Sequence, residues 1–469
     1  MYNKVISEKM AEAYEAFSVV RHPLPVSAFM NAAPDSRKAA TFFTCMAALS
    51  AYSTRLRIKY CYDSYLSGCQ LHVFIVGDPS TGKGTLDNIQ NMLSSKLLER
   101  DMAEREKELA YENKRKTKSA NQRIEEPPVT CVLVLPPSTS KYKICLRAGN
   151  IYQKYADTLF FYMTTAELGT VLDANRAAFS DLRAITRLSY DLDAKYGIDH
   201  GGDGFAGIVN INMSGLFFGT EHAVDNYFNR AAILDGNLSR AIIVDIPQEI
   251  GQDPPMFKPI ADNDTAVINT VLEKLINNIF DDENDTLKDT VFMDMDFLIP
   301  TIEHFQAVAK REAVRSQSWA MDMLRKRASV SACRVASICC YLYNISNELL
   351  PAAETFSEKE IKDFATAIYA YTAYHTLDTS LQRYGNFADS LKELSKERHQ
   401  SGRTSIYRAM PKVFTKADLE LELEKYEAKA PVRVYIYKWI STGKIRAVGP
   451  DKYEKAPFGN PKQQELCIE

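Results

Sequence analysis

The sequence lacks any uninterrupted apolar run approaching the ~18 residues that a membrane-spanning helix needs. Residues 1–16 are charged and contain no apolar segment of the kind that a secretory signal peptide requires. We therefore expect a soluble protein of the cytoplasm.

Paired cysteines at metal-ligand spacing are also absent. The nine cysteines are scattered along the chain, and Cys333, Cys339 and Cys340 fall within an apolar pattern of helical period. Small buried thiols are common in such positions. We expect core cysteines in a reducing compartment and no cysteine-ligated metal.

An excess of basic residues is missing as well. The chain has 57 Lys and Arg against 60 Asp and Glu, which gives a formal net charge of −3. Any contact with nucleic acid must therefore come from local patches or from a channel. With 469 residues, 46% of them apolar, the chain can bury two or three cores.

What is present is a glycine-rich segment at residues 77–85, which reads Gly-Asp-Pro-Ser-Thr-Gly-Lys-Gly-Thr after the apolar stretch 71–76. Gly77 and Gly82 allow backbone N–H groups to surround a phosphate, and Lys83 reaches the β- and γ-phosphates. The helix expected from Lys83 points the positive end of its dipole at them. We expect ATP to be bound by Gly77, Asp78, Pro79, Ser80, Thr81, Gly82, Lys83, Gly84 and Thr85. Since Gly84 replaces the usual hydroxyl residue, Mg²⁺ is expected to use Thr85 or water.

Further apolar, β-rich segments follow at residues 129–135, 158–163, 207–218 and 240–246, separated by helical stretches. This alternation predicts an open parallel sheet with helices on both faces. We expect an α/β fold: a P-loop NTPase core of the AAA+ or RecA type, with helical domains before and after it and a C-terminal winged helix. The expected segments are a helical region at 1–67, the ATPase core at 68–260, a helical domain at 261–400, and the winged-helix region and tail at 401–469.

ATP hydrolysis needs a carboxylate to activate water, a polar sensor near the γ-phosphate and usually an arginine that neutralises charge in the transition state. Glu167 follows the strand at 158–163 and is the candidate base, although Ala166 replaces the usual metal-binding aspartate. Thr164 or Thr165 is the candidate for a hydroxyl near the metal. Thr220 is the candidate sensor, with helix capping as the alternative. Arg240 is the candidate arginine finger acting across a subunit interface, with a surface salt bridge as the alternative.

Two regions are candidates for contact with DNA. Residues 175–200, with Arg183, Arg187 and Lys195, lead into a Gly-Gly-Asp-Gly turn that suits either a hairpin facing a pore or a loop between subunits. In residues 414–456 the pattern of helix, helix and β-wing places Arg433 and Lys438 on the second helix and Lys444 and Arg446 on the wing. Winged helices also bind proteins. Of Tyr435 and Trp439, four residues apart, at least one is expected in the core.

A charged segment at residues 97–118 alternates acidic and basic residues and has few apolar positions. It predicts an exposed helix or hairpin. A basic lever at Lys114, Arg115, Lys116 and Lys118 that touches nucleic acid is the alternative.

These features occur in an order that resembles a family. After the phosphate loop come Pro-Pro-Ser-Thr-Ser, Thr-x-Ala-Glu-Leu-Gly-Thr-Val-Leu, Ser-Gly-Leu-x-x-Gly-Thr and Gly-Asn-Leu-Ser-Arg. The series resembles the helicase-like, AAA+-type ATPases of phages, plasmids and integrative elements of Bacteroides-type bacteria, over about residues 23–384. The resemblance implies that Lys83 and Thr85 contact the nucleotide, Glu167 acts in catalysis, Thr220 senses and Arg240 is the finger. It also implies ATP, Mg²⁺ and an association with a primase.

Three functions follow as hypotheses. The first is an ATP-driven DNA translocase or helicase of a mobile element or phage, working as a ring, expected to be a hexamer, in replication or mobilisation. It would act with a primase or replication initiator. The second is a slowly hydrolysing ATP switch that assembles on DNA or on a protein, favoured by the missing aspartate at Ala166. The third is a small nucleotide kinase, disfavoured by the length of the chain and by the absence of a basic lid.

Overall fold

The computed structural model describes residues 3–117, 126–169, 183–198, 207–247, 251, 253, 255–400, 406–407, 409–425 and 431–455. The chain divides into two compact units, Met1–Ala388 and Asp389–Glu469. The first three expected segments fall largely within the first unit. The helix α14 (Glu358–Gln400) contains residues of both units.

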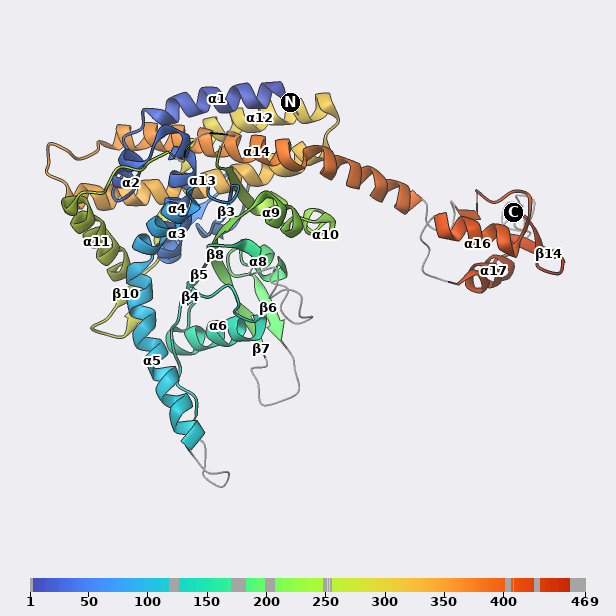
Figure 1. The fold of residues 1–469 in the computed structure, drawn as a ribbon, viewed down its shortest axis with the longest axis horizontal. Coiled ribbons are helices and arrows are strands. Elements are labelled where there is room, and N and C mark those ends of the chain that lie inside the picture. Colours follow the sequence, from blue (N-terminus) through green and yellow to red (C-terminus); the bar gives the residue numbers. More distant parts are fainter. Residues whose placement is uncertain are drawn as a thin grey trace, which may run out of the picture. The chain divides into compact units, whose positions relative to one another are not determined.

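The centre of the first unit is a five-stranded parallel sheet in the order β4-β5-β8-β3-β9 (Figure 1). Its strands are β3 (His72–Val76), β4 (Val134–Leu135), β5 (Phe160–Thr165), β8 (Asn212–Gly219) and β9 (Ala241–Asp245). All residues of β3 and β8 are buried, as in sheets covered on both faces. The sheet therefore matches the expected parallel α/β core, and its strands all end at one common edge, the carboxyl edge.

Helices cover both faces of this sheet. On one face α3 (Lys38–Ser50) packs across β8, β3 and β9, with α4 (Lys83–Leu93) beside it. On the other face lie α8 (Arg183–Leu188), α9 (Glu221–Tyr227) and α10 (Arg230–Leu234), where Phe74 of β3 contacts the rings of Tyr227 and Phe228. Buried aromatic side chains thus fix the sheet to its second helical layer.

The outer strands of the sheet are protected in different ways. Along β4, the helix α5 (Ser95–Thr117) places the carboxylate of Asp101 2.8 Å from the Leu133 N–H and 2.6 Å from the Val134 N–H. Glu104 accepts from the Cys131 N–H in the same way. Side chains of α5 therefore take the hydrogen bonds that a further strand would otherwise make. At β9, Arg383 of α14 bonds the carboxylate of Asp245.

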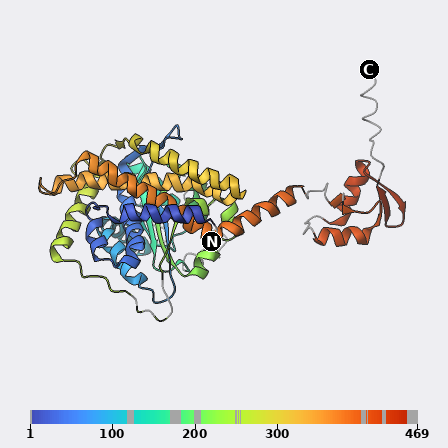
Figure 2. The ribbon, with the colours of Figure 1, turned by 90° about the horizontal axis from the view of Figure 1, so that it is seen from above.

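A helical layer packs on this core. In Figures 1 and 2, α12 (Ile299–Ser316), α13 (Trp319–Leu349) and α14 run side by side. The helix α1 (Lys4–Ser18) is joined to α14 by the bond from Ser7 to Asp378, at 2.7 Å. Ser318 caps α13, and Ser357 with Glu360 forms a reciprocal capping box at the start of α14. The remaining helical elements of this unit are α2 (Val26–Ala32), η1 (Asp35–Arg37), η2 (Ala51–Arg55), α6 (Lys141–Tyr155), η3 (Leu238–Arg240), α11 (Asp262–Asn277) and η4 (Asp296–Leu298).

The two segments expected to be mainly helical also contain short strands. β1 (Leu56–Lys59) pairs with β2 (Leu66–Ser67) and, in parallel, with β12 (Val291–Met293). A further pair joins β10 (Phe280–Asp281) to β11 (Thr286–Leu287). Strands of two to four residues carry too few positions for a period to show. The link between β1 and β12 forms across more than 200 residues, which no local pattern reports.

Other boundaries differ as well. The expected strand at 207–218 is two strands: β7 (Gly207–Asn210) pairs with β6 (Lys195–Ile198) in an antiparallel hairpin, and β8 enters the central sheet. Of the segment 129–135, only Val134–Leu135 is a strand. The helix expected from Lys83 ends at Leu93 with Ser94 as its cap, and α5 begins at Ser95. Within the described part of the chain, no helix has the length and apolarity to cross a bilayer.

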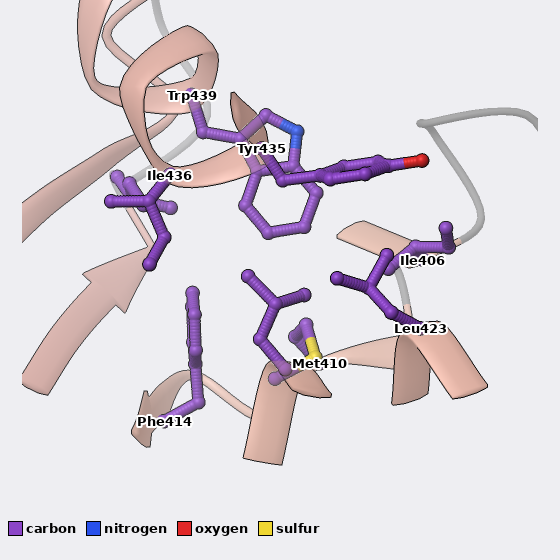
Figure 3. Packing of buried hydrophobic residues seen from close by; sticks show 9 residues of the cluster. Ile406, Met410, Phe414, Leu423, Tyr435, Ile436 and Trp439 are labelled. Carbon is purple, nitrogen blue, oxygen red and sulfur yellow. The ribbon is translucent and has the colours of Figure 1, made fainter. Parts of the chain in front are cut away.

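The second unit has its own small core. Its elements after residues 406–410 are β13 (Val413–Thr415), α16 (Lys416–Lys425), α17 (Val432–Ser441), β14 (Ile445–Gly449) and β15 (Lys452–Lys455), with the three strands in the order β13-β15-β14. Thr415 and Asp418 form a capping box at α16. Figure 3 shows Tyr435, Ile436 and Trp439 of α17 directed toward Phe414 and its neighbours. Tyr435 and Trp439 are thus both core residues.

Candidate functional site

The glycine-rich loop lies at the carboxyl edge of the sheet, between β3 and α4. Ser80 and Gly82 adopt φ angles of 68° and 85°, a left-handed conformation that is unusual for a serine. A Cβ atom on Gly77 would lie 2.6 Å from the Thr81 hydroxyl, which itself donates to the Asp78 carbonyl at 2.9 Å. The loop is therefore folded tightly on itself, and position 77 has no room for a side chain.

Lys83 begins α4 and turns back over the loop. Its ammonium group donates to the carbonyls of Gly77 at 2.5 Å and of Asp78 at 3.1 Å. Burial lowers the pKa of Lys83 from its ordinary value, while the charges of Asp78 and Glu167 act in the opposite direction. The ammonium group of Lys83 thus bonds only neutral acceptors, and an anionic phosphate oxygen would be a stronger acceptor.

Glu167 stands in the turn directly after β5, and its charge reaches Lys83. The Thr165 hydroxyl fixes this turn, because it accepts from the Glu167 N–H at 3.1 Å and donates to the Glu167 carbonyl at 2.8 Å. One strand, β8, separates β5 from β3, so the two strand ends lie about 10 Å apart at the usual spacing of about 4.8 Å. Glu167 and the loop are therefore separated by the width of two strand spacings, with the end of β8 between them.

Thr220 follows the strand between them, β8, and so stands at the same edge. Its hydroxyl accepts from the Ala223 N–H at 3.3 Å and caps α9. The Gly77 N–H donates to the Gly219 carbonyl, which ties this strand end to the loop. Thr220 therefore serves as the helix cap of the alternative interpretation, at the place where a sensor is expected.

Arg240 lies at the other end of the sheet. It precedes Ala241, which pairs with His72, whereas the loop begins after Val76, about 16 Å further along β3. Its guanidinium bonds Asp191 at 3.1 Å and the Gly236 carbonyl at 3.1 Å. Arg240 thus cannot reach the loop of its own chain, and it is held in an ion pair, as the alternative interpretation expects.

Asp191 also bonds Arg327 of α13 at 2.9 Å. The ring of Tyr190 lies against the guanidinium of Arg334 at 4.0 Å. Arg334 in turn donates to the carbonyls of Gln70 and Tyr190 and to the Ser67 hydroxyl. We call Tyr190, Asp191, Arg240, Arg327 and Arg334 the arginine cluster.

The residues expected to bind Mg²⁺ supply only part of its ligands. Thr85 lies in the first turn of α4, and Glu167 is the nearby carboxylate; Gly84 and Ala166 supply no ligand. Among the described residues no group of three metal-ligating side chains occurs. Mg²⁺ commonly binds one or two carboxylates together with substrate phosphates and keeps several waters. These residues would accept such an ion only together with a bound nucleotide.

Sequence reasoning missed Arg383, which the fold brings to the carboxyl edge from α14. Arg383 bonds Asp245, the last residue of β9, at 2.8 Å and Glu221, next to Thr220, at 3.2 Å. Tyr384 bonds Asp225 of α9 at 2.7 Å. No local signal distinguishes Arg383 from other helical arginines, since its partners lie about 140 and 160 residues earlier.

The candidate DNA-binding residues near the hairpin take different positions. Arg183 begins α8, and Arg187 forms an ion pair with Asp235 at 3.1 Å. Lys195 is exposed on β6. Residues 175–182, the glycine-rich turn at 201–204 and Lys118 lie outside the described residues.

In the second unit, Arg433 and Lys438 are exposed on α17, together with Val434, Tyr437 and Ile440. The two wing residues are engaged within the unit. Lys444 lies 5.8 Å from the ring of Tyr407, and Arg446 bonds Glu454 at 2.7 Å. The exposed face of α17 therefore carries positive charge together with apolar groups.

No model of a known protein family matches the chain. A search of curated proteins likewise gives no match. The functional argument therefore depends on the site itself.

Proposed function

We propose that the protein is an ATP-driven motor, a translocase or helicase that acts on DNA as a ring of identical subunits. The observation that carries the proposal is the meeting of the phosphate loop, Glu167 and Thr220 at one edge of a parallel sheet, with β8 between the strands of the loop and of the glutamate. Phosphoryl transfer to water needs these groups around one phosphate.

In this proposal Lys83 leaves the carbonyls of Gly77 and Asp78 and binds the β- and γ-phosphates. Glu167 accepts a proton from the attacking water, and Thr220 contacts the γ-phosphate or that water. Mg²⁺, when bound with the nucleotide near Thr85, would neutralise phosphate charge.

Arg240 requires a second subunit, because it lies about 16 Å from the loop of its own chain. We propose that contact with a neighbouring subunit exchanges the Asp191 partner of Arg240 for the neighbour's nucleotide. A ring, expected to be a hexamer, satisfies this need at every site.

The DNA would contact the β6–β7 hairpin with Lys195, and the second unit. The order of helices and strands in that unit, with two strands forming a hairpin after α17, supports a winged helix. Arg433 and Lys438 would contact backbone phosphates. A primase or replication initiator is the proposed protein partner.

The test is ATP turnover by the purified protein with and without single-stranded DNA, on fractions sized by light scattering. Turnover stimulated by DNA and confined to a ring-sized species supports the proposal. Turnover that ignores DNA in every fraction contradicts the motor function.

A second candidate is an ATP-dependent switch that assembles on DNA or on a protein. Ala166, in place of an acidic metal ligand, and the ion pair of Arg240 with Asp191 favour it, because both slow hydrolysis. Nucleotide-dependent assembly without turnover would support the switch. The kinase hypothesis predicts phosphoryl transfer to a nucleoside monophosphate by a monomer.

A further inference from the structure

Arg37, a residue of the N-terminal region, contacts the phosphate loop from behind. It ends η1, just before α3, and only 3% of its surface is exposed. One guanidinium nitrogen donates to the Pro247 carbonyl at 2.8 Å and to the Ser36 carbonyl at 3.4 Å, and the other donates to the Thr81 carbonyl at 3.4 Å. A buried cation therefore joins the loop to a segment 44 residues earlier in the chain.

All three acceptors are neutral backbone carbonyls. Within the described residues no carboxylate forms an ion pair with Arg37, whereas the next residue, Lys38, pairs with Asp35 at the surface. An arginine keeps its charge even when buried, and a buried charge without a counter-charge is costly. Among the described residues the charge of Arg37 thus has no bonded counter-charge, and an anion in the loop would supply one.

The contact with Thr81 also sets the direction of a peptide group. In a trans peptide the C=O and the following N–H point in opposite directions. Because the Thr81 carbonyl points toward Arg37, the Gly82 N–H points away from it. That N–H has no hydrogen-bond acceptor in the described part of the chain, and Gly82 holds a left-handed φ of 85°.

The contact with Pro247 fixes the other side of the loop. Pro247 follows Ile246, whose N–H donates to the Val76 carbonyl at 2.7 Å. Ile246 also lies where a side chain on Gly77 would be, at 3.2 Å. Arg37 therefore holds together the chain segments that leave β3 and β9, and it closes the loop from the side opposite to its open face.

We propose that Arg37 is a positioning residue for the triphosphate of a bound nucleotide. It keeps the Gly82 N–H free for a phosphate oxygen and adds positive charge behind the loop. Nucleotide binding is thereby linked to the N-terminal region. This inference rests on the proposed function of the loop.

The test compares dissociation constants for ATP, ADP and AMP, measured by calorimetry on the full chain. Arg37→Gln removes the charge, and Arg37→Lys keeps a charge but loses the fork that reaches two carbonyls. Lys38→Gln is the matched control, since it removes the adjacent cation at the surface. Thermal unfolding without nucleotide reports whether each variant is folded.

For Arg37→Gln we expect ATP to bind about ten- to a hundredfold more weakly, the range of one or two charge-assisted hydrogen bonds. The loss should decrease from ATP to ADP to AMP, because it depends on phosphate charge. Arg37→Lys should lose less than Arg37→Gln for ATP, and Lys38→Gln should bind like the wild type. A role confined to folding would lower stability and weaken all three ligands equally.

Three results would overturn the inference in distinguishable ways. If both Arg37→Gln and Arg37→Lys bind ATP as tightly as the wild type does, Arg37 does not position the phosphates. The same conclusion follows if the variants lose affinity for ATP, ADP and AMP to the same extent. If Arg37→Gln fails to fold, an Arg37→Lys variant that is folded and binds ATP, ADP and AMP as the wild type does contradicts the proposal. If the wild type binds no nucleotide, both the proposed function and this inference are contradicted.

Discussion

Lys83 and Arg37, at the carboxyl edge of the central sheet, are bonded differently from Arg240 and Arg327 at its amino edge. At the carboxyl edge, Lys83 and Arg37 bond backbone carbonyls, and neither has a carboxylate bonded to it within the described residues. At the amino edge, Arg240 and Arg327 share the carboxylate of Asp191. A cation without a bonded carboxylate favours the binding of an anion. A cation that is already paired with a carboxylate must first give up that partner.

In the proposed function, this difference would let one chain hold a nucleotide while lacking a free arginine to act on it. The carboxyl edge is available for ligand in a single subunit. Under the same proposal, Arg240 would leave Asp191 only when a second subunit presents a phosphate that competes with this carboxylate.

The largest effect is expected for Arg240→Ala, which should reduce ATP turnover about a thousandfold if the arginine acts across an interface. Mixing Arg240→Ala with Lys83→Ala should restore part of the activity, since some sites then pair an intact loop with an intact arginine. Turnover of the mixture is the measurement. A control Lys362→Ala change, at a surface pair with Glu358, should leave it unaltered. Full activity of Arg240→Ala alone would break the comparison, because the amino edge would then have no part in catalysis.

Next in size is Glu167→Gln, which should slow hydrolysis about 100- to 1,000-fold while leaving ATP binding intact, because general bases contribute effects of this size. Single-turnover hydrolysis and equilibrium binding separate the two. Glu273→Gln, at a surface pair with Lys96, is the control. Loss of binding instead of turnover would show that Glu167 serves the metal or the loop and does not activate water.

Lys83→Ala should weaken ATP binding at least about a hundredfold, since it removes a charged contact to two phosphates. Lys96→Ala, also a lysine on a helix of the core, should bind normally. Equal affinity of Lys83→Ala and the wild type would contradict a ligand site at the carboxyl edge.

The smallest effect concerns the pH dependence of stability at the amino edge. Burial raises the pKa of Asp191, but Arg327 and Arg240 outweigh it, so the folded-state pKa is lowered. The ion pairs therefore stabilise the fold above the unfolded pKa of about 4 and lose this contribution as pH falls through the lower folded value. Because Asp191 is 44% exposed, we expect Asp191→Asn to cost about 1 kcal/mol at pH 7.

Urea unfolding at pH 7 and pH 3 provides the measurement. The difference between wild type and Asp191→Asn should shrink at the lower pH. A difference that stays constant would mean that the charge of Asp191 does not hold the arginine cluster.

Local sequence patterns predicted the glycine-rich loop and the parallel sheet. The loop at 77–85 and the strands around it are continuous segments whose glycines and apolar runs have a direct local meaning. The parallel sheet was predicted for the same reason, since its strands are separated by helical stretches that allow no short hairpin.

Contacts between segments that are distant in the chain could not be predicted from the sequence. Arg37, Arg383 and Asp191 reach their partners only after the helical layer packs on the sheet, across 44 to more than 200 residues. Nothing in the residues next to them indicates those partners. The wing residue Arg446 is a similar case, because its pairing with Glu454 depends on the register of β14 and β15.

The most direct test of the central claim is an experimental structure of the protein with a slowly hydrolysed ATP analogue and Mg²⁺. The account predicts the triphosphate over residues 77–85, with Lys83 moved from the carbonyls of Gly77 and Asp78 to the phosphates. A saturated complex with an empty loop, or with the nucleotide bound elsewhere, would contradict it.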